Sequence, residues 1–445
     1  MARKVFISFL GTNNYGKCTY VRDDFKSKEV RYTQVATLDL LTRKGEWSKA
    51  DVAYILLTNA AESKNWVDNG HKNRDTNEVI VQTGLESQLK AMNLPMKIDT
   101  IAQLPDGNNE EEIWAIFESV FSKLEQDDEL YFDLTHGYRY LPMLILVLSN
   151  YAKFLKNVIV KHISYGNYEG RNIETNEALL VDLLPFTSLQ DWTFAAGQYL
   201  ESGNVNKLVK LSKDKLQPLL RDALKRDASL FALNKFIANL DAVVEERHFC
   251  RGIGIIDSEN FKKLKDSTDV LEQTIIPQLN PIIQKIEESF EGFVPDENVM
   301  NGFAVVKWCT QNNLYQQATT ILQENIQSLV CESNGLNWRT ERERDIVDVA
   351  VWVYYNRKED NESEWNLKLP LNATNDEKKL RIECIRKVLG NEQFLKFALL
   401  YNELKDLRND FNHSGMRNNP SSASSMRTKI ERIIADVFKI LNPSN

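Results

Sequence analysis

Short apolar runs alternate with helical patterns through the first part of the chain. The apolar runs predict strands at 5–10, 53–58, 97–104, 130–134, 158–164 and 179–184. Apolar residues at three- and four-residue spacing predict helices over 113–124 and 140–154. Strands that alternate with helices form βα units, and runs this uniformly apolar fit a mostly parallel sheet covered on both faces. The pattern therefore predicts an α/β domain over residues 1–186.

Strand signals fade after about residue 187. Helical spacing continues through the rest of the chain, at 189–200, 216–240, 258–271, 282–290, 314–329 and 340–355. We therefore predict an α-helical bundle for the second half. We divide it into a linking region, 187–340, and a C-terminal helical domain, 341–445.

The penultimate predicted helix carries the pair of residues around which we organise the chain. Its apolar face consists of Phe394, Phe397, Ala398, Tyr401, Leu404, Leu407 and Phe411. Arg408 projects from the polar flank, and Gly415 is a plausible helix stop. His413 follows Arg408 by five residues, so the two side chains point about 140° apart. A single helix does not bring them together, whereas a second copy of the helix can.

An arginine and a histidine suit the cleavage of RNA by its own 2′-hydroxyl. Histidine can accept and donate a proton near neutral pH, and arginine can place a fixed positive charge on the reacting phosphate. This reaction needs no metal. The alternative interpretation is structural, because cationic residues also favour the C-termini of helices.

Composition narrows the classes of protein. A chain of 445 residues predicts two or three domains, and a net charge of −8 argues against a general nucleic-acid coat protein. The five cysteines are scattered without metal-ligand spacing, which predicts neither a zinc site nor a disulfide framework. The most apolar run, 141–148, is far shorter than a membrane span, and we expect a cytoplasmic protein.

Polar residues follow three of the predicted strands. Gly11, Thr12, Asn13, Asn14 and Tyr15 follow the first strand, and Thr58 and Asn59 end the second. The run Asp133-x-Thr135-His136-Gly137-x-Arg139 joins the fourth strand to a helix. The carboxyl ends of parallel strands share one crevice, and backbone N–H groups at a helix N-terminus favour phosphate. The sequence therefore predicts a site for phosphate and base at this edge of the sheet.

The first of these loops also spells most of a P-loop. Gly11 to Lys17 reads GxxxxGK, but Cys18 stands where serine or threonine must hold magnesium. The following segment, 20–35, reads as strand and turn instead of the required helix. A P-loop NTPase is therefore a minor alternative.

Both ends of the chain resemble known families. Gly11-Thr12-x-x-Tyr15, the 133–139 run and the strand exit at 165–169, which contains Asn167, resemble the CARF sensor domain. The segment 313–318 is similar to the same family. Arg408-Asn409 followed by His413 resembles the RxxxxH signature of HEPN ribonucleases. Together they resemble the CRISPR-associated CARF-HEPN ribonucleases of type III systems.

The resemblance implies a homodimer, or a higher oligomer, with a Rossmann-like sensor of cyclic oligoadenylate and a single-stranded RNA endoribonuclease that needs no metal cofactor. Cyclic tetra-adenylate is the first expectation for the activator and cyclic hexa-adenylate the second. Arg408, His413 and Asn409 are the expected catalytic residues, and the products should carry a 2′,3′-cyclic phosphate. The expected ligand-binding residues are those of the polar strand ends, namely Gly11, Thr12, Asn13, Asn14, Tyr15, Thr58, Asn59, Thr135, His136, Gly137, Arg139 and Asn167. A nucleotide-sensing regulator with an inactive helical domain is the main alternative.

Overall fold

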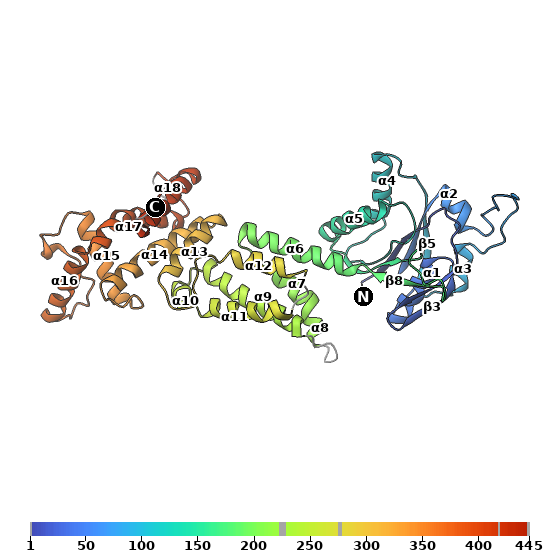
Figure 1. Ribbon diagram of the computed structural model, residues 1–445. Coiled ribbons are helices and arrows are strands. Elements are labelled where there is room, and N and C mark those ends of the chain that lie inside the picture. The colour runs from blue at the N-terminus through green and yellow to red at the C-terminus, as the bar shows by residue number, and fades with distance from the viewer. Residues whose placement is uncertain (1, 222–227, 275–277, 417–418, 443–445) are drawn as a thin grey trace. The chain divides into compact units, whose positions relative to one another are not determined.

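The computed structural model describes residues 2–221, 228–274, 278–416 and 419–442 (Figure 1). The chain divides into two compact units, Met1–Gln190 (unit 1) and Asp191–Asn445 (unit 2). The division lies four residues beyond the predicted end of the first domain. The further division at residue 340 stays a prediction.

In the described part of unit 1, eight strands form one sheet in the order β3-β2-β8-β7-β6-β1-β4-β5. Their bounds are β1 Lys4–Phe9, β2 Cys18–Arg22, β3 Phe25–Val30, β4 Val52–Thr58, β5 Lys97–Leu104, β6 Glu129–Asp133, β7 Ile159–Gly166 and β8 Glu177–Asp182. Only the pairs β2–β3 and β7–β8 are antiparallel. The predicted mostly parallel α/β sheet is therefore confirmed.

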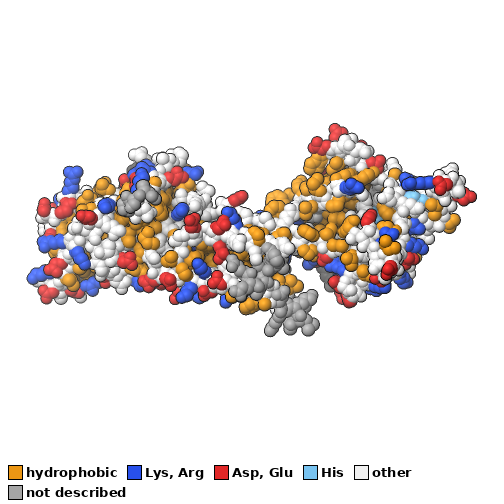
Figure 2. Space-filling model, in the orientation of Figure 1, with side chains coloured by type: hydrophobic (Ala, Val, Ile, Leu, Met, Phe, Trp, Pro, Cys, Tyr) orange, Lys and Arg blue, Asp and Glu red, His pale blue; other side chains and the backbone are white. Residues whose placement is uncertain are grey.

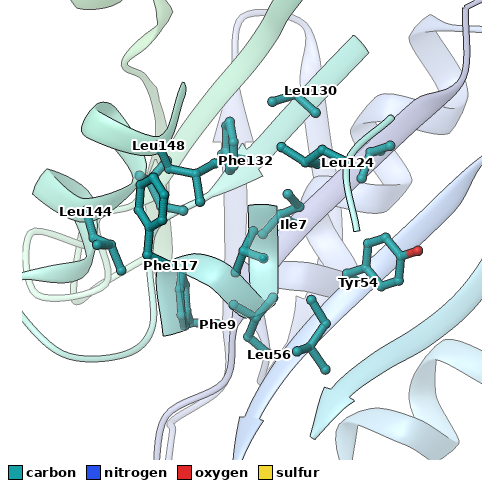
Figure 3. Close-up of a cluster of buried hydrophobic side chains, with 14 of the residues drawn as sticks. Ile7, Phe9, Tyr54, Leu56, Phe117, Leu124, Leu130, Phe132, Leu144 and Leu148 are labelled. Carbon is teal, nitrogen blue, oxygen red and sulfur yellow. The ribbon is translucent and has the colours of Figure 1, made fainter. Parts of the chain in front are cut away.

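Helices cover both faces of this sheet. The helices are α1 Thr33–Lys44, α2 Asn59–Ala61, α3 Leu85–Ala91, α4 Glu110–Phe121 and α5 Leu141–Lys156, with a π-helical turn, η1, at Glu62–Trp66. Side chains alternate along β1, so Val5, Ile7 and Phe9 pack with α4 and α5. Figure 3 shows Ile7 and Phe9 in this core with Phe117 of α4 and Leu144 and Leu148 of α5. Phe6 points the other way and belongs to the core that α1 and α3 cover.

The central strand β1 lies between β6 and β4, and all three run parallel. Their carboxyl ends therefore lie together at one edge of the sheet. After the β2–β3 hairpin, the chain adds β4 and β5 on one side of β1 and then β6 on its other side. The edge between β1 and β6 is therefore a topological switch point, where open α/β sheets bind ligands.

Unit 2 is helical in its described residues. Its elements begin with α6 Leu184–Ser202, which starts in unit 1, and continue with α7 Asn206–Leu211, η2 Ser212–Leu216, α8 Gln217–Arg221, α9 Ala228–His248, α10 Gly252–Asp257, α11 Glu259–Thr274, α12 Asn280–Glu288, α13 Met300–Gln311, α14 Tyr315–Ser333, α15 Glu341–Tyr355, α16 Asn375–Leu389, α17 Glu392–Asn412 and α18 Ala423–Leu441. Each predicted helix overlaps one or more of these. Residues 222–227 of the predicted helix 216–240 lie outside the described residues.

The penultimate helix, α17, has the predicted apolar face with one difference. Phe394, Phe397, Ala398, Tyr401, Leu404 and Leu407 are buried, but Asp410 is buried in place of Phe411. The helix ends at Asn412, and Gly415 has a φ of +67°. No helix in the described residues is long and apolar enough to cross a membrane.

Candidate functional site

A cavity of about 590 Å³ opens at the carboxyl ends of β1, β4 and β6. Ten of the twelve predicted ligand-binding residues line it: Gly11, Thr12, Asn13, Asn14, Tyr15, Thr58, Thr135, His136, Gly137 and Arg139. Asn59 and Asn167 are not among the lining residues. Asn59 begins the short helix α2, and the side chain of Asn167 accepts a hydrogen bond from the Gly170 N–H at 3.2 Å.

The loop after β1 forms one wall of the cavity. The Tyr15 hydroxyl lies so close to Gly11 that a Cβ at this position would collide with it. The Tyr15 ring packs against the His136 ring at 4.0 Å between centroids and a tilt of 33°, which joins this loop to the loop after β6. Arg31 donates to the Asn14 Oδ1 at 3.1 Å and to the Tyr15 carbonyl. Side chains from three segments therefore fix the loop.

The loop after β6 is fixed by a chain of hydrogen bonds. The Gly166 N–H donates to the Thr135 hydroxyl at 2.8 Å, and that hydroxyl donates to Asp133 Oδ1. The Thr135 N–H donates to the same carboxylate oxygen at 3.0 Å. Gly137 has a φ of +112° and no room for a Cβ beside Leu141 and Phe9, so only glycine fits this turn. Thr135 therefore holds the loop as well as lining the cavity.

Two titratable groups lie at the cavity, the buried Asp133 beneath it and the half-buried His136 in its lining. Burial raises the pKa of the Asp133 carboxyl to about 6, against the hydrogen bonds from Thr135. Burial lowers the pKa of the His136 imidazole to about 3, so this ring is neutral at physiological pH. Its Nε2 lies 3.5 Å from the Thr33 N–H. A neutral ring packed against Tyr15 can contact a base but cannot neutralise a phosphate.

Replacing Asp133 with asparagine should stabilise the protein at neutral pH. The folded pKa of Asp133 is raised, so stability falls as pH rises from about 4 to about 6. The ionised carboxylate then costs up to about 3 kcal/mol above pH 6, at about 1.4 kcal/mol for each unit of pKa difference. We expect Asp133→Asn to raise the melting temperature at pH 7.5 and to leave it nearly unchanged at pH 4.

The exposed Asp75→Asn is the matched control and should show no such pH dependence. The lowered pKa of His136 also makes stability depend on pH, but equally in wild type and variant. It therefore cancels in the difference between their melting temperatures. A variant that is less stable than wild type at pH 7.5 would show that the Asp133 charge is needed for the fold.

The P-loop alternative does not fit the structure. Strand β2 begins at Cys18, directly after Gly16 and Lys17, where a P-loop requires a helix N-terminus. Lys17 is exposed and is not among the residues that line the cavity.

The prediction missed several cavity residues. Arg31 directly follows β3, and the β2–β3 hairpin brings it to the loop after β1. Tyr20, Tyr138 and Tyr140 also line the cavity. Two further lining residues, Tyr165 and Tyr168, belong to the strand exit at 165–169. Except for Tyr20, which lies within β2, these tyrosines follow a predicted strand end within six residues. Rings for stacking, amides for hydrogen bonding and Arg31 and Arg139 for charge suit a ligand with bases and phosphates.

The proposed catalytic residues lie in unit 2. Arg408 is half-buried, and its Nη1 donates to Glu324 Oε1 on α14 at 2.7 Å. The other oxygen of Glu324 accepts from Arg344 on α15 at 2.6 Å. Asn409 and His413 are exposed, and the His413 N–H donates to the Asn409 carbonyl at 3.0 Å. Glu324 therefore holds the guanidinium of Arg408, whereas the imidazole at the helix end lies at the surface.

Arg408 lines a second cavity, of about 340 Å³, whose lining also includes Arg251, Arg339, Arg344 and Glu324. His413 is not among its lining residues. One chain therefore does not bring Arg408 and His413 into one cavity, in keeping with their separation along a single helix.

Two comparisons relate the chain to known proteins, and the first falls within unit 1. Residues 5–169 match the family described as CRISPR system endoribonuclease Csx1, CARF domain. The chain is also similar to the CRISPR-associated protein MJ1674 of Methanocaldococcus jannaschii, with 25% identity over 238 residues. This alignment covers 52% of this chain and 34% of that protein. The chain thus spans about a third of the length of this relative. These matches support a CRISPR-associated protein with a CARF domain, and the cavity-forming residues belong to that domain.

Proposed function

We propose that the protein is a ribonuclease of type III CRISPR defence that cyclic oligoadenylate activates through the cavity of unit 1. The observation that carries this proposal is that the residues around the cavity at the switch point fall within the segment that matches the CARF family. Tyrosine rings suit the adenines, and backbone amides with Arg31 and Arg139 suit the phosphates. Cyclic tetra-adenylate is the first choice of ligand and cyclic hexa-adenylate the second.

The proposed chemistry belongs to α17. The 2′-hydroxyl of the RNA attacks the neighbouring phosphorus, the bond to the 5′-oxygen breaks, and the products carry a 2′,3′-cyclic phosphate and a 5′-hydroxyl. Arg408 holds the phosphate and offsets its developing charge. Its guanidinium has five N–H donors, and the contact with Glu324 uses one nitrogen, so donors remain for a phosphate. His413 moves the proton or orients the 2′-hydroxyl, and Asn409 helps to orient the pair.

A second copy of the chain completes this proposal. A cyclic ligand with two-fold symmetry fits two CARF domains related by a two-fold axis, and two copies of α17 can bring Arg408 of one and His413 of the other together. Ligand binding then shifts the dimer toward the state in which these groups are correctly spaced.

The exposed side of α5 is the surface that suits the dimer contact. Met143, Val147, Tyr151 and Phe154 recur at helical spacing along it and are all exposed, Phe154 at 87%. Figure 2 shows hydrophobic side chains gathered over α4 and α5. Contiguous exposed apolar side chains of this kind mark interaction surfaces.

Phe154→Glu should therefore convert the dimer to a monomer. Placing a charge in an apolar contact leaves it desolvated and unpaired, which weakens the contact by several kcal/mol, or about a thousandfold in the dimer dissociation constant. Light scattering after size-exclusion chromatography measures the change. Ile173→Glu is the control, because Ile173 is equally exposed but belongs to the turn between β7 and β8 and not to α5. A dimer that survives in Phe154→Glu would place the contact elsewhere.

The direct test combines binding with cleavage. Calorimetric titration of each ring into the protein measures the first half of the proposal, and cleavage of a labelled single-stranded RNA in EDTA measures the second. Binding with ring-dependent cleavage supports the ribonuclease. Binding without cleavage by the dimer supports the alternative, a nucleotide-sensing regulator with an inactive helical domain. Failure to bind either ring overturns the proposed ligand class.

A further inference from the structure

A buried asparagine lies behind the loop that follows β1. Asn65 is fully buried and belongs to the π-helical turn η1, whose Val67 N–H bonds to the Glu62 carbonyl. It is not among the residues that line the cavity. Single π-helical turns are rare and occur often at functional sites.

The Asn65 side-chain amide makes four hydrogen bonds, and all four require the same placement of its oxygen and nitrogen. Its Nδ2 donates to the carbonyl oxygens of Gly11 and Asn13, at 2.9 Å each. Its Oδ1 accepts from His71 Nε2 at 3.0 Å and from the Tyr32 hydroxyl at 3.3 Å. The two carbonyls can only accept, so the NH₂ group must face the loop.

These bonds determine which way the loop presents its backbone. In a planar trans peptide the carbonyl of one residue and the N–H of the next point in opposite directions. With the carbonyls of Gly11 and Asn13 turned to Asn65, the N–H groups of Thr12 and Asn14 point away from it. Neither N–H donates to an acceptor within the part of the chain that the structure describes. Both residues line the cavity.

We infer that Asn65 is a positioning residue that turns the amide N–H groups of Thr12 and Asn14 toward the cavity, where they bind a phosphate of the ligand. Backbone N–H groups of one turn that are directed to the same side can form an anion-binding concavity. His71 and Tyr32 support Asn65 by fixing its amide orientation. The assignment to a nucleotide phosphate rests on the proposed function, whereas the role of Asn65 in orienting the loop does not.

Asn65→Asp is the most direct variant, because it keeps the shape and replaces the donor with an oxygen that repels both carbonyls. Asn65→Ala removes the side chain, and His71→Ala removes one support while keeping Asn65. Asn73→Ala is the matched control, since the exposed Asn73 side chain caps a turn of the adjoining hairpin without reaching the cavity. His71 is only half-buried, so its variant tests the idea even where the Asn65 variants fail to fold.

Two measurements separate the two levels of the inference. Hydrogen exchange of the ligand-free loop, 10–17, should be about tenfold faster in both Asn65 variants. The lost hydrogen bonds should raise the equilibrium constant for local opening of the loop by about a factor of ten. In RNA cleavage, the concentration of cyclic tetra-adenylate, or of cyclic hexa-adenylate, that gives half-activation should rise about tenfold, while the rate at saturating ring stays near wild type. His71→Ala should give a smaller change in the same direction, and Asn73→Ala none.

Unchanged loop exchange in a folded Asn65 or His71 variant would overturn the positioning role. Faster exchange with unchanged half-activation would overturn the phosphate contact. A wild-type protein that binds neither ring would overturn the proposed ligand class, and the exchange comparison would still decide whether Asn65 orients the loop.

Discussion

His413→Ala should reduce ring-activated RNA cleavage by at least about a hundredfold, because a positioned acid or base contributes about 10²–10⁴ to such reactions. His413 is exposed at the end of α17, so its removal should leave folding and ring binding unchanged. The assay follows cleavage of a labelled single-stranded RNA with cyclic tetra-adenylate and EDTA. The end groups of the products show whether a 2′,3′-cyclic phosphate forms.

Lys396→Ala is the control for this experiment. Lys396 lies on the same helix and is also exposed, but it lies near the opposite end of α17. It should cleave as the wild type does. Undiminished cleavage by His413→Ala would remove the HEPN assignment, whereas loss of ring binding would show that the variant had changed more than the reaction.

Much of unit 1 can be predicted from sequence because apolar runs mark buried parallel strands. The segments at β1, β4 and β6 are almost wholly apolar, and their polar exits lie together because parallel strands share one edge. The helix α1 was not predicted. Thr33, Gln34 and Thr37 are buried within it, so its inward face does not read as an apolar stripe.

Site residues were harder to predict where they lie in segments that lack the regular apolar spacing of a helix or strand. Arg31 reaches the β1 loop only because the β2–β3 hairpin folds back onto the sheet. Asn65 lies in a π-helical turn, whose five-residue hydrogen bond leaves no regular pattern in sequence. The contact between Arg408 and Glu324 joins residues on different helices, and no sequence spacing encodes it.

The contact between Arg408 and Glu324 also bears on the proposed ribonuclease site. Glu324 bridges Arg408 and Arg344, so α14, α15 and α17 share one ionic network. A substrate phosphate near Arg408 therefore meets a guanidinium whose position is already fixed. Fixed donors stabilise developing charge without reorganising during the reaction, which is the advantage expected of a preorganised site.

The second large effect should appear in the binding of the ring by the cavity of unit 1. Arg139→Ala should weaken binding of cyclic tetra-adenylate by about 10- to 100-fold, because a charge-assisted hydrogen bond to phosphate contributes about 1.5–3 kcal/mol. Arg139 lines the cavity and its side chain is exposed, so the fold should not depend on it. Calorimetric titration measures the affinity, and the cleavage assay should show the same increase in the ring concentration needed for half-activation.

Arg74→Ala removes the same charge from an exposed position outside the cavity and should bind the ring as the wild type does. The comparison matters because unit 1 could lose affinity through its overall charge alone, and long-range attraction would fall equally in both variants. If Arg139→Ala binds and activates as well as Arg74→Ala, the phosphate contact must lie elsewhere, and Arg31 is then the cation in the cavity wall that remains to be tested.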